Sequence, residues 1–398
     1  MKNILQRISL NYLFILYAFF IPLSLDLLRA CAILITIVWI GQSKFHHTFH
    51  AIGSNHFFQA FGLLLSILLF SLLWTDPAHL LFGIKYITRY WYLLPMFAIY
   101  TSIDRRFISF SLSAFLSGMF LSEIISYGIF FELLHFGHIH KGDPSPFMHH
   151  TLYSVFLVLT AGILLNRIFT SASVRHKIVY ALFFTTVTSN LFLNSGRTGQ
   201  FLFGFILLLV SIQYYKLTIK SLFLTFSFLC ITLYLAFSLS PNYKSRMLQT
   251  YDSLQTISYD TPIGSRIGLN IVAKDIFLEH PLLGVGVGDY LSEKAKMITK
   301  KYPDREYVKS LAHYHNQYAE FTVIAGLFGL FSYLLLLASL FDIPIKDRRL
   351  HTVKLILVST IAIASLSDAI FHLNRPLSLF ALFAGLLLAQ SRYEEYES

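Results

Sequence analysis

Two arginines have the residue type and setting that could bind a negatively charged group. Arg197 stands between Gly196 and Gly199, which leave the backbone free to approach a ligand, and Arg266 follows Ser265. A guanidinium presents a planar fork of N–H donors that matches a phosphate. Two such forks on the same side of a membrane could hold the two phosphates of a diphosphate. The alternatives are an arginine that extends to the membrane surface and a solvated arginine.

His315 is the candidate general base, because a neutral imidazole can accept a proton near neutral pH. Asn316 and Glu320, four residues apart, would share a helix face beside it. Glu320 is about one turn beyond His315 and could orient the imidazole or stabilise its charge. The alternative is an interfacial histidine, of which the sequence has several: His79, His135, His138, His140, His149, His150 and His313.

Charged residues near or within apolar segments form a second group of candidates, for which pairing between helices is an equally good explanation. They are Asp26, Arg29, Lys85, Arg89, Glu123, Glu132, Asp368, His372 and Arg375. A transporter would use such residues, so that class stays open. The glycine-rich segment 284–288 lacks the strand–turn–helix context of a nucleotide-binding loop, and we interpret it as a backbone turn.

The composition is that of a membrane protein that crosses the bilayer many times. The chain has 398 residues, of which 55% are hydrophobic and only 13% charged, with a mean hydropathy of +0.61. Soluble domains carry about 25% charged residues. The net charge of +10 is scattered between apolar segments, which excludes a nucleic-acid patch. Two cysteines in apolar segments cannot form a disulfide framework or a metal cluster.

A membrane-spanning helix needs about 20 apolar residues, and twelve segments approach that length. The predicted spans are 9–22, 25–41, 57–74, 80–100, 107–132, 150–168, 177–194, 199–215, 219–240, 313–341, 351–372 and 374–391. We therefore predict an all-α fold in three parts: spans 1–9 in residues 1–240, a large loop over 241–312, and spans 10–12 with a short tail in 313–398.

The distribution of basic residues predicts which way the chain is oriented. One side of the membrane receives most of them: Lys2, Arg7, Lys44, Arg105, Arg106, Arg167, Arg175, Lys177, Lys216, Lys220, Lys346, Arg348, Arg349, Lys354 and Arg392. The short connections on the other side hold chiefly Lys141, Arg197 and Arg375. The positive-inside rule then places both termini in the cytoplasm and the 241–312 loop outside.

Two helices are expected within the loop. Residues 265–280 have an apolar side, with Ser265 as the N-cap and Pro281 as the end, and this helix could lie along the membrane surface. Residues 291–301 form a second, basic helix candidate.

The motifs together resemble the O-antigen ligase and polymerase superfamily of bacterial envelope glycosyltransferases. The resemblance is carried by Ser265-Arg266, by Pro281-Leu282-Leu283-Gly284-Val285-Gly286, and by His315-Asn316 followed after nine residues by Gly326-Leu327-Phe328-Gly329. The turn Ser195-Gly196-Arg197-Thr198-Gly199 matches the family's outer arginine turn. A long loop between the ninth and tenth of twelve spans is also similar to the ligases.

This resemblance implies transfer of a glycan from undecaprenyl diphosphate to a sugar hydroxyl of lipid A-core, in lipopolysaccharide biosynthesis on the outer, periplasmic face of a Gram-negative inner membrane. The transfer would be inverting and would need no metal or cofactor. Arg197 and Arg266 would bind the diphosphate, and His315 would deprotonate or position the acceptor hydroxyl. The substrate-binding residues we expect are Arg197, Arg266, Asn316, Glu320, Lys244 and Arg246.

Other functions remain open at this point. A polymerase of the same superfamily uses the same donor and similar arginines, and the His315-Asn316 motif favours the ligase. Protein O-oligosaccharyltransferases tend to carry extra sequence after the last spans, which argues against that member. A transporter would show paired inverted repeats, and the sequence has none that we detect.

Overall fold

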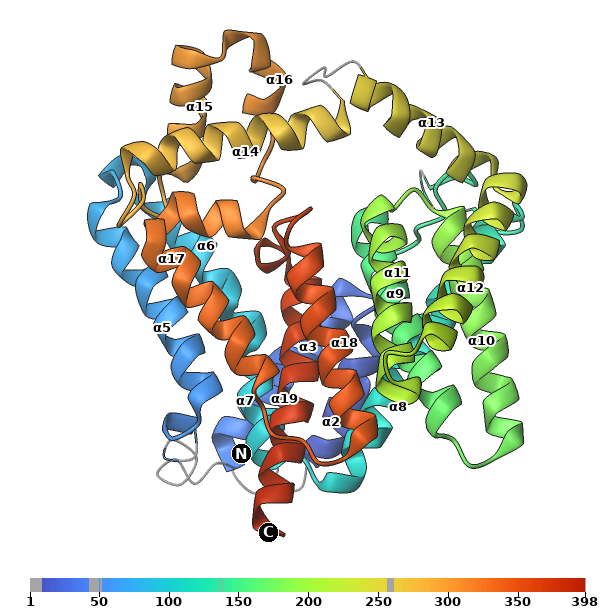
Figure 1. Ribbon diagram of the computed structural model, residues 1–398. Helices are drawn as coiled ribbons and strands as arrows, with labels where there is room; N and C mark the ends of the chain where they lie inside the picture. Colours follow the sequence, from blue (N-terminus) through green and yellow to red (C-terminus); the bar gives the residue numbers. More distant parts are fainter. Residues whose placement is uncertain are drawn as a thin grey trace.

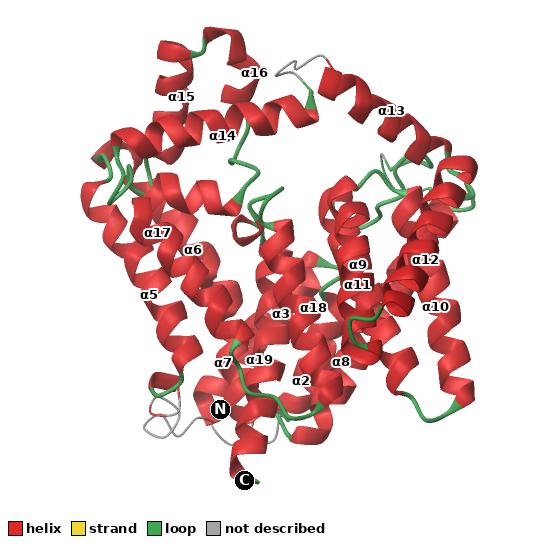
Figure 2. Ribbon diagram, viewed as in Figure 1, coloured by secondary structure: helices red, strands yellow, loops and turns green. Residues whose placement is uncertain are grey.

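The protein is a bundle of α-helices with a helical layer across one end. The structure is a computed structural model that describes residues 9–42, 50, 52–135, 137, 139–255 and 261–397. Within these ranges the regular elements are all α- or 3₁₀-helices (Figure 2), in agreement with the predicted fold class. In Figure 1, α2 begins and α19 ends at the lower end of the bundle, whereas α14 crosses the upper end.

Each predicted span overlaps a helix. The helices of the bundle are α2 (Leu10–Phe20), α3 (Leu25–Gln42), α5 (His56–Phe70), α6 (Leu80–Thr88), α7 (Leu94–Ser102), α8 (Arg105–Phe130), α9 (His150–Thr170), α10 (Val174–Leu193), α11 (Arg197–Tyr215), α12 (Ile219–Leu239), α17 (Gln317–Phe341), α18 (Arg348–Ala364) and α19 (Asn374–Tyr396).

Seven helical segments of the described chain are long and apolar enough to cross a membrane. They are Leu25–Gln42, His56–Trp74, Arg105–Phe130, His150–Thr170, Arg197–Tyr215, Ile219–Leu239 and Gln317–Phe341. The large apolar side chains exposed along α12 suit contact with lipid, because few of its residues are buried in the protein. The full count of twelve spans stays a prediction.

The predicted spans 80–100 and 351–372 are not continuous α-helices. Residues 80–100 divide into α6, the 3₁₀ helix η3 (Arg89–Leu93) and α7, in which Pro95 occupies one of the first two positions. Proline has no N–H and fits there, because the first turn of a helix needs none. The predicted span 351–372 ends early: α18 stops at Ala364, and a turn leads to η5 (Ile370–His372).

The turn after α18 is held against the start of α17. The backbone N–H of Gln317 donates to the Ser365 carbonyl at 2.8 Å, and the Gln317 side-chain oxygen accepts from the Phe371 N–H at 2.7 Å. If α18 continued through this turn, the Ser365 carbonyl and the Phe371 N–H would pair with backbone groups of the same helix; here Gln317 pairs with both. The turn therefore lies at the upper end of the bundle, between the two helices.

α9 is the central helix of one half of the bundle, where it packs against α10, α11 and α18. In the other half, α5 packs against α17 and α7 against α19. Across the upper end lies α14 (Pro262–Glu279), with α15 (Tyr290–Lys301) and α16 (Glu306–Lys309) beyond it, and α13 (Pro241–Gln255) continues this layer over α11 and α12 (Figure 1).

The loop helices differ in part from the prediction. α14 begins three residues before Ser265: its N-cap is Thr261, whose hydroxyl accepts from the Gly264 N–H at 3.0 Å, and Pro262 opens the helix. α15 lies where the second helix was predicted, over Tyr290–Lys301. α13 was not predicted.

The glycine-rich turn repairs a break inside α17. Ala325 and Gly326 have non-helical backbone angles, so two carbonyls of the preceding turn lose their usual partners. The Val285 N–H donates to the Val323 carbonyl and the Gly286 N–H to the Ile324 carbonyl, both at 2.9 Å. In return the Leu327 N–H donates to the Pro281 carbonyl at 2.8 Å. The motifs 281–286 and 326–329 are therefore two sides of one backbone contact.

Gly326→Ala is expected to destabilise the protein. Gly326 has φ +60°, and an added Cβ would lie 2.4 Å from the Leu282 carbonyl carbon and oxygen. The backbone conformation alone would cost about 1–3 kcal/mol, and the clash would add to it. The measurement is the thermal unfolding midpoint of the detergent-purified protein.

The matched control is Gly62→Ala within α5, where an added Cβ meets nothing within 4 Å. Alanine favours a helix over glycine by roughly 1 kcal/mol, so this variant should match or exceed the wild type. Equal midpoints for Gly326→Ala and the wild type would contradict the backbone contact described above.

Candidate functional site

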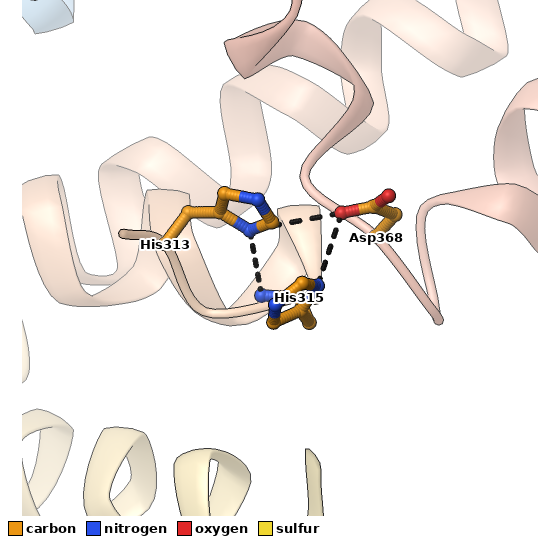
Figure 3. A group of neighbouring side chains, drawn as sticks. All are labelled: His313, His315 and Asp368. Atoms are coloured by element: carbon orange, nitrogen blue, oxygen red, sulfur yellow. Dashed lines mark hydrogen bonds and ion pairs between the residues drawn. The ribbon is translucent and has the colours of Figure 1, made fainter. Parts of the chain in front are cut away.

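Ser367 and Asp368, in the turn after α18, are where the separate motifs meet. Asp368 Oδ1 lies 3.3 Å from His315 Nδ1 and 3.6 Å from His313 Nδ1 (Figure 3). The Ser367 carbonyl accepts from Arg266 Nε at 3.2 Å. The Ser367 hydroxyl lies 2.9 Å from that of Thr198, the neighbour of Arg197, and the two share a hydrogen bond. Two adjacent residues thus bring the histidine, the α14 arginine and the start of α11 together.

The geometry at His315 suits a base oriented by a carboxylate. Asp368 faces Nδ1, which leaves Nε2 to accept a proton from a substrate. The His315 backbone has φ +48°, an unusual conformation for a residue other than glycine. Such strain is held only where the surroundings enforce it, and it is common at functional sites. His315 is about one-quarter exposed, whereas Asp368 is almost fully buried.

The His313 side chain binds the backbone of His315. Its Nδ1 accepts the backbone N–H of His315 at 3.2 Å, so the ring is a neutral acceptor at that nitrogen. Burial lowers the pKa of His313 to about 4, and the charge of His315 contributes in the same direction. The opposing influence of Asp368 and Glu320 does not overcome burial. His313 is therefore uncharged at neutral pH.

The arginines form a positive group next to the histidine. Arg266 is largely buried, and burial lowers its pKa while Asp368 opposes the change. Arg197, at the first position of α11, lies close enough to Arg246 and Arg266 for their charges to repel. The repulsion of Arg197 by two neighbouring guanidiniums favours the binding of an anion beside it. Arg246 lies on α13, so this group draws on three helices.

The glycines around Arg197 serve packing rather than access to a ligand. A Cβ on Gly196 would lie 2.3 Å from Ser154 Cβ, and one on Gly199 would lie 2.4 Å from the Ser154 carbonyl oxygen. Both glycines let the turn press directly against α9. Ser154 also accepts the Gly199 N–H at 3.1 Å. The sequence predicts that these glycines let a ligand approach the backbone, whereas in the structure α9 lies against them.

Asp143 fixes the same turn from the other side. Its carboxylate lies 2.7 Å from His150 Nδ1, and it accepts from the Ser195 N–H at 3.3 Å and from the Ser145 hydroxyl at 3.1 Å. Burial alone would raise the pKa of Asp143, but these bonds outweigh it and hold the pKa below its usual range. His149, the residue before His150, interacts electrostatically with both Asp368 and His315.

Asn316 and Glu320 lie beside the site, in positions that hold the backbone. The Asn316 side chain caps α17 by accepting from the Ala319 N–H, and its amide donates to Asn270 on α14 at 2.9 Å. Glu320 is fully buried, and its carboxylate contacts groups other than the His315 ring. It accepts from the Tyr86 hydroxyl at 2.8 Å and lies 3.3 Å from His372 Nδ1.

Glu320 also determines the path of the chain that carries the histidines. Its second carboxylate oxygen accepts from the Tyr314 N–H at 3.3 Å, directly between His313 and His315. Lys294 on α15 is buried beneath this segment and donates to the Leu311 carbonyl. Burial lowers the pKa of Lys294 to about 8. A buried lysine is not available to a substrate, unlike the other lysines of α15.

The remaining predicted residues lie apart from this group. Lys244 is exposed on α13 and lies over the Phe237 ring of α12, 5.5 Å from its centroid. Asp26 pairs with Arg29 at 3.0 Å, and Glu132 pairs with Lys141 at the same distance. Arg89 donates to the His372 carbonyl at 2.7 Å, and the His372 ring lies beside Glu320. His372, one of the charged candidates near the spans, therefore has contacts through both its backbone and its side chain.

The trio of His313, His315 and Asp368 is the one grouping within the described chain whose ligand atoms, all within 4.8 Å of one another, could hold a metal ion. However, the lone pair of His313 Nδ1 already accepts the His315 N–H. A cation at this nitrogen would break that bond. The arrangement is better suited to an oriented base than to a metal centre.

Asp368 belongs to the second group of charged candidates predicted from the sequence, whereas Ser367, Asp143 and Ser154 are not among the predicted site residues. The available signal was an acidic residue beside the outer end of a span, next to a helix-ending serine. Its partner histidine is more than fifty residues away in the chain, so no local pattern joins the two.

One family comparison bears on this geometry. Residues 181–334 match the family described as O-Antigen ligase. The match runs from α10 into α17, and so includes the Arg197 turn, Arg266, the glycine turn and His315. No curated protein matches the chain. Asp368 lies beyond the matched segment.

The buried His313 predicts a pH dependence of stability. Its pKa is lower in the folded state, about 4, than its ordinary value of 6.5, so the unfolded chain binds an extra proton between these values. Stability should therefore fall as the pH drops from 6.5 towards 4, by as much as ~3 kcal/mol from this residue. Thermal unfolding of wild type and His313→Gln across this range measures the difference.

The wild type should lose more stability on acidification than His313→Gln does. His176→Gln, at an exposed position near the start of α10, is the control and should titrate like the wild type. Parallel curves for the wild type and His313→Gln would show that His313 takes up its proton equally in both states.

Proposed function

We propose that this chain is a member of the O-antigen ligase and polymerase superfamily and that it acts as the ligase. It would transfer a glycan from undecaprenyl diphosphate to a sugar hydroxyl of lipid A-core. The observation that carries the proposal is the convergence on Ser367 and Asp368 of an oriented histidine and an arginine-rich anion site. A transfer from a diphosphate carrier needs both: a base for the incoming hydroxyl and positive charge for the departing diphosphate.

In the proposed reaction the acceptor oxygen attacks the anomeric carbon of the donor glycan. The bond from that carbon to the diphosphate oxygen breaks, and the electron pair leaves with undecaprenyl diphosphate. His315 Nε2 takes the hydroxyl proton, and Asp368 stabilises the imidazolium that forms at Nδ1. Attack opposite the leaving group inverts the anomeric configuration.

Arg197 and Arg266 would bind the two phosphates, and Arg246 would add charge from α13. Their mutual repulsion in the unliganded protein would be relieved by the diphosphate, whose negative charge grows as the carbon–oxygen bond breaks. The glycosyl bond is already activated in the carrier, so the reaction needs no nucleotide. Asn316 and Glu320 would act by holding the backbone that carries His315.

The sidedness of the reaction follows from the distribution of charge. The site lies at the end of the bundle where α9 begins and α18 ends, next to the α13–α16 layer (Figure 1). The basic residues of the connections gather at the opposite end. We therefore place the site on the periplasmic face of the inner membrane, with the acceptor lipid in the outer leaflet.

The experiment is a gel of glycolipids from cells that lack this protein, with separate detection of lipid A-linked and carrier-linked glycan. A ligase predicts bare core on lipid A and long chains that accumulate on the carrier. Core that carries a single repeat would instead identify the polymerase. Two unchanged pools would overturn the glycosyltransfer assignment.

The same cells, complemented with variants, test the residues. Arg197→Ala, Arg266→Ala and His315→Ala should each lower transfer at least about 100-fold, because each removes charge stabilisation or the base. Asp368→Asn should also slow transfer, since it no longer stabilises the imidazolium. Lys141→Ala removes an exposed basic residue paired with Glu132 and should leave transfer unchanged. Normal transfer in any of the first three would remove that residue from the site.

Chelation tests the absence of a catalytic metal. Membranes washed with EDTA should transfer glycan at the untreated rate, because His315 and the arginines supply the base and the charge. Loss of transfer after the wash, with recovery on adding Zn²⁺ or Mg²⁺, would instead assign a bound cation to His313, His315 and Asp368.

A further inference from the structure

A polar cavity of about 410 Å³ lies at the other end of the bundle. It is lined by the start of α8, the end of α9 and the start of α18, together with Tyr180 of α10 and Gln390 of α19. α9 runs from the candidate site at His150 to the cavity at Arg167, which is roughly 25 Å along a helix. The cavity is therefore separate from the proposed active site.

Three arginines line the cavity, and only one carboxylate. Arg105 lies at the start of α8, Arg167 near the end of α9 and Arg349 at the start of α18, while Asp347 is the acidic residue of the wall. Asp347 is paired with Arg349, Oδ2 to Nη2 at 3.1 Å. Arg105 pairs with Glu397, outside the cavity lining. The wall keeps an excess of positive charge.

Arg167 is the cavity arginine whose charge is not neutralised by a carboxylate of the described chain. It donates to the Ser113 hydroxyl at 3.0 Å and lies over the Tyr180 ring, 5.6 Å from its centroid. Among the residues that the structure describes, it has no carboxylate partner within ion-pair distance. The charges of Arg167 and Arg349 also repel each other across the cavity wall. A partly buried guanidinium in such a setting favours an anion.

Neutral polar groups of the wall are already engaged and make it rigid. The Asn166 amide donates to the Arg349 carbonyl at 2.9 Å and its oxygen accepts from Tyr214, while Gln390 donates to Glu394 at 2.7 Å. These contacts fix the start of α18 to α9. The helix ends that carry Arg167 and Arg349 are therefore fixed to each other before a ligand binds.

Hydroxyl groups of Ser109, Thr170 and Ser171 complete the polar part of the lining, and five side chains form an apolar part. Ile108, Leu112, Ile163, Leu350 and Val353 continue the wall from the arginines towards the interior of the bundle. A small inorganic anion would use only the polar rim. A phosphodiester with hydrocarbon attached would use both surfaces, and the ends of membrane helices are where lipid headgroups lie.

We propose that this cavity binds the phosphate of an anionic phospholipid, with Arg167 and Arg349 as its forks and the apolar wall against its acyl chains. The bound lipid joins α8, α9 and α18 and so stabilises the folded bundle. By the charge distribution, it belongs to the leaflet opposite the proposed reaction. The assignment is independent of the proposed glycosyl transfer.

The test is thermal unfolding of the full chain, delipidated in detergent, as phosphatidylglycerol is titrated in. A ligand that binds only the folded state raises the unfolding midpoint. Phosphatidylglycerol should raise it for the wild type, and phosphatidylcholine of the same chains should not. Arg349→Gln and Arg167→Gln should need about tenfold more phosphatidylglycerol or beyond, because each loses a charged hydrogen bond.

Arg106→Gln is the matched control, since Arg106 neighbours Arg105 on α8, is exposed and lies outside the cavity lining. It should respond to phosphatidylglycerol like the wild type. Arg349 is also exposed, so its variant keeps the test decisive if Arg167→Gln fails to fold. Equal responses of all variants, or of both lipids, would overturn the proposal. An equal shift with inorganic phosphate alone would overturn the lipid assignment in favour of a free anion.

Discussion

The hydrogen-bonding needs of a broken helix organise the upper end of this protein. A backbone group left unpaired at membrane depth costs several kcal/mol, so the interruption of α17 at Ala325 and Gly326 must be repaired. The segment 281–286 repairs it with three backbone bonds. Only glycine accepts the conformation at Gly326 and the approach of Leu282. The same contact pulls the loop that carries α14 and α15 down onto the bundle.

A second interruption then creates the site. Because α18 stops at Ala364, the turn that follows can present the Ser367 carbonyl to Arg266 and the Asp368 carboxylate to His315. Gln317, at the start of α17, satisfies the backbone on both sides of that turn. Both breaks involve α17, so His315 is held between the repaired helix and the turn. The strained φ at His315 is the local consequence.

Local sequence patterns predict several residues of the candidate site. Arg197, Arg266 and His315 each stand in a short motif, and the structure brings all three to the same end of the bundle. The sequence does not rank Asp368 above other charged residues, because its contact with His315 joins residues more than fifty positions apart in the chain. Nor could it tell that Gly196 and Gly199 meet α9 rather than a ligand, since glycine permits close approach to either.

Charge explains why the two ends of the bundle are built differently. At the upper end, arginines repel one another but face Asp368, a buried carboxylate that the histidines partly neutralise. Under the proposed function, this site would bind a diphosphate for the transfer and release it afterwards. At the lower end, the only acidic side chain of the cavity wall is already paired, and Arg167 keeps its full charge. In the proposed lipid site the phosphate would neutralise this charge, whereas at the upper end the proposed diphosphate would neutralise the arginines.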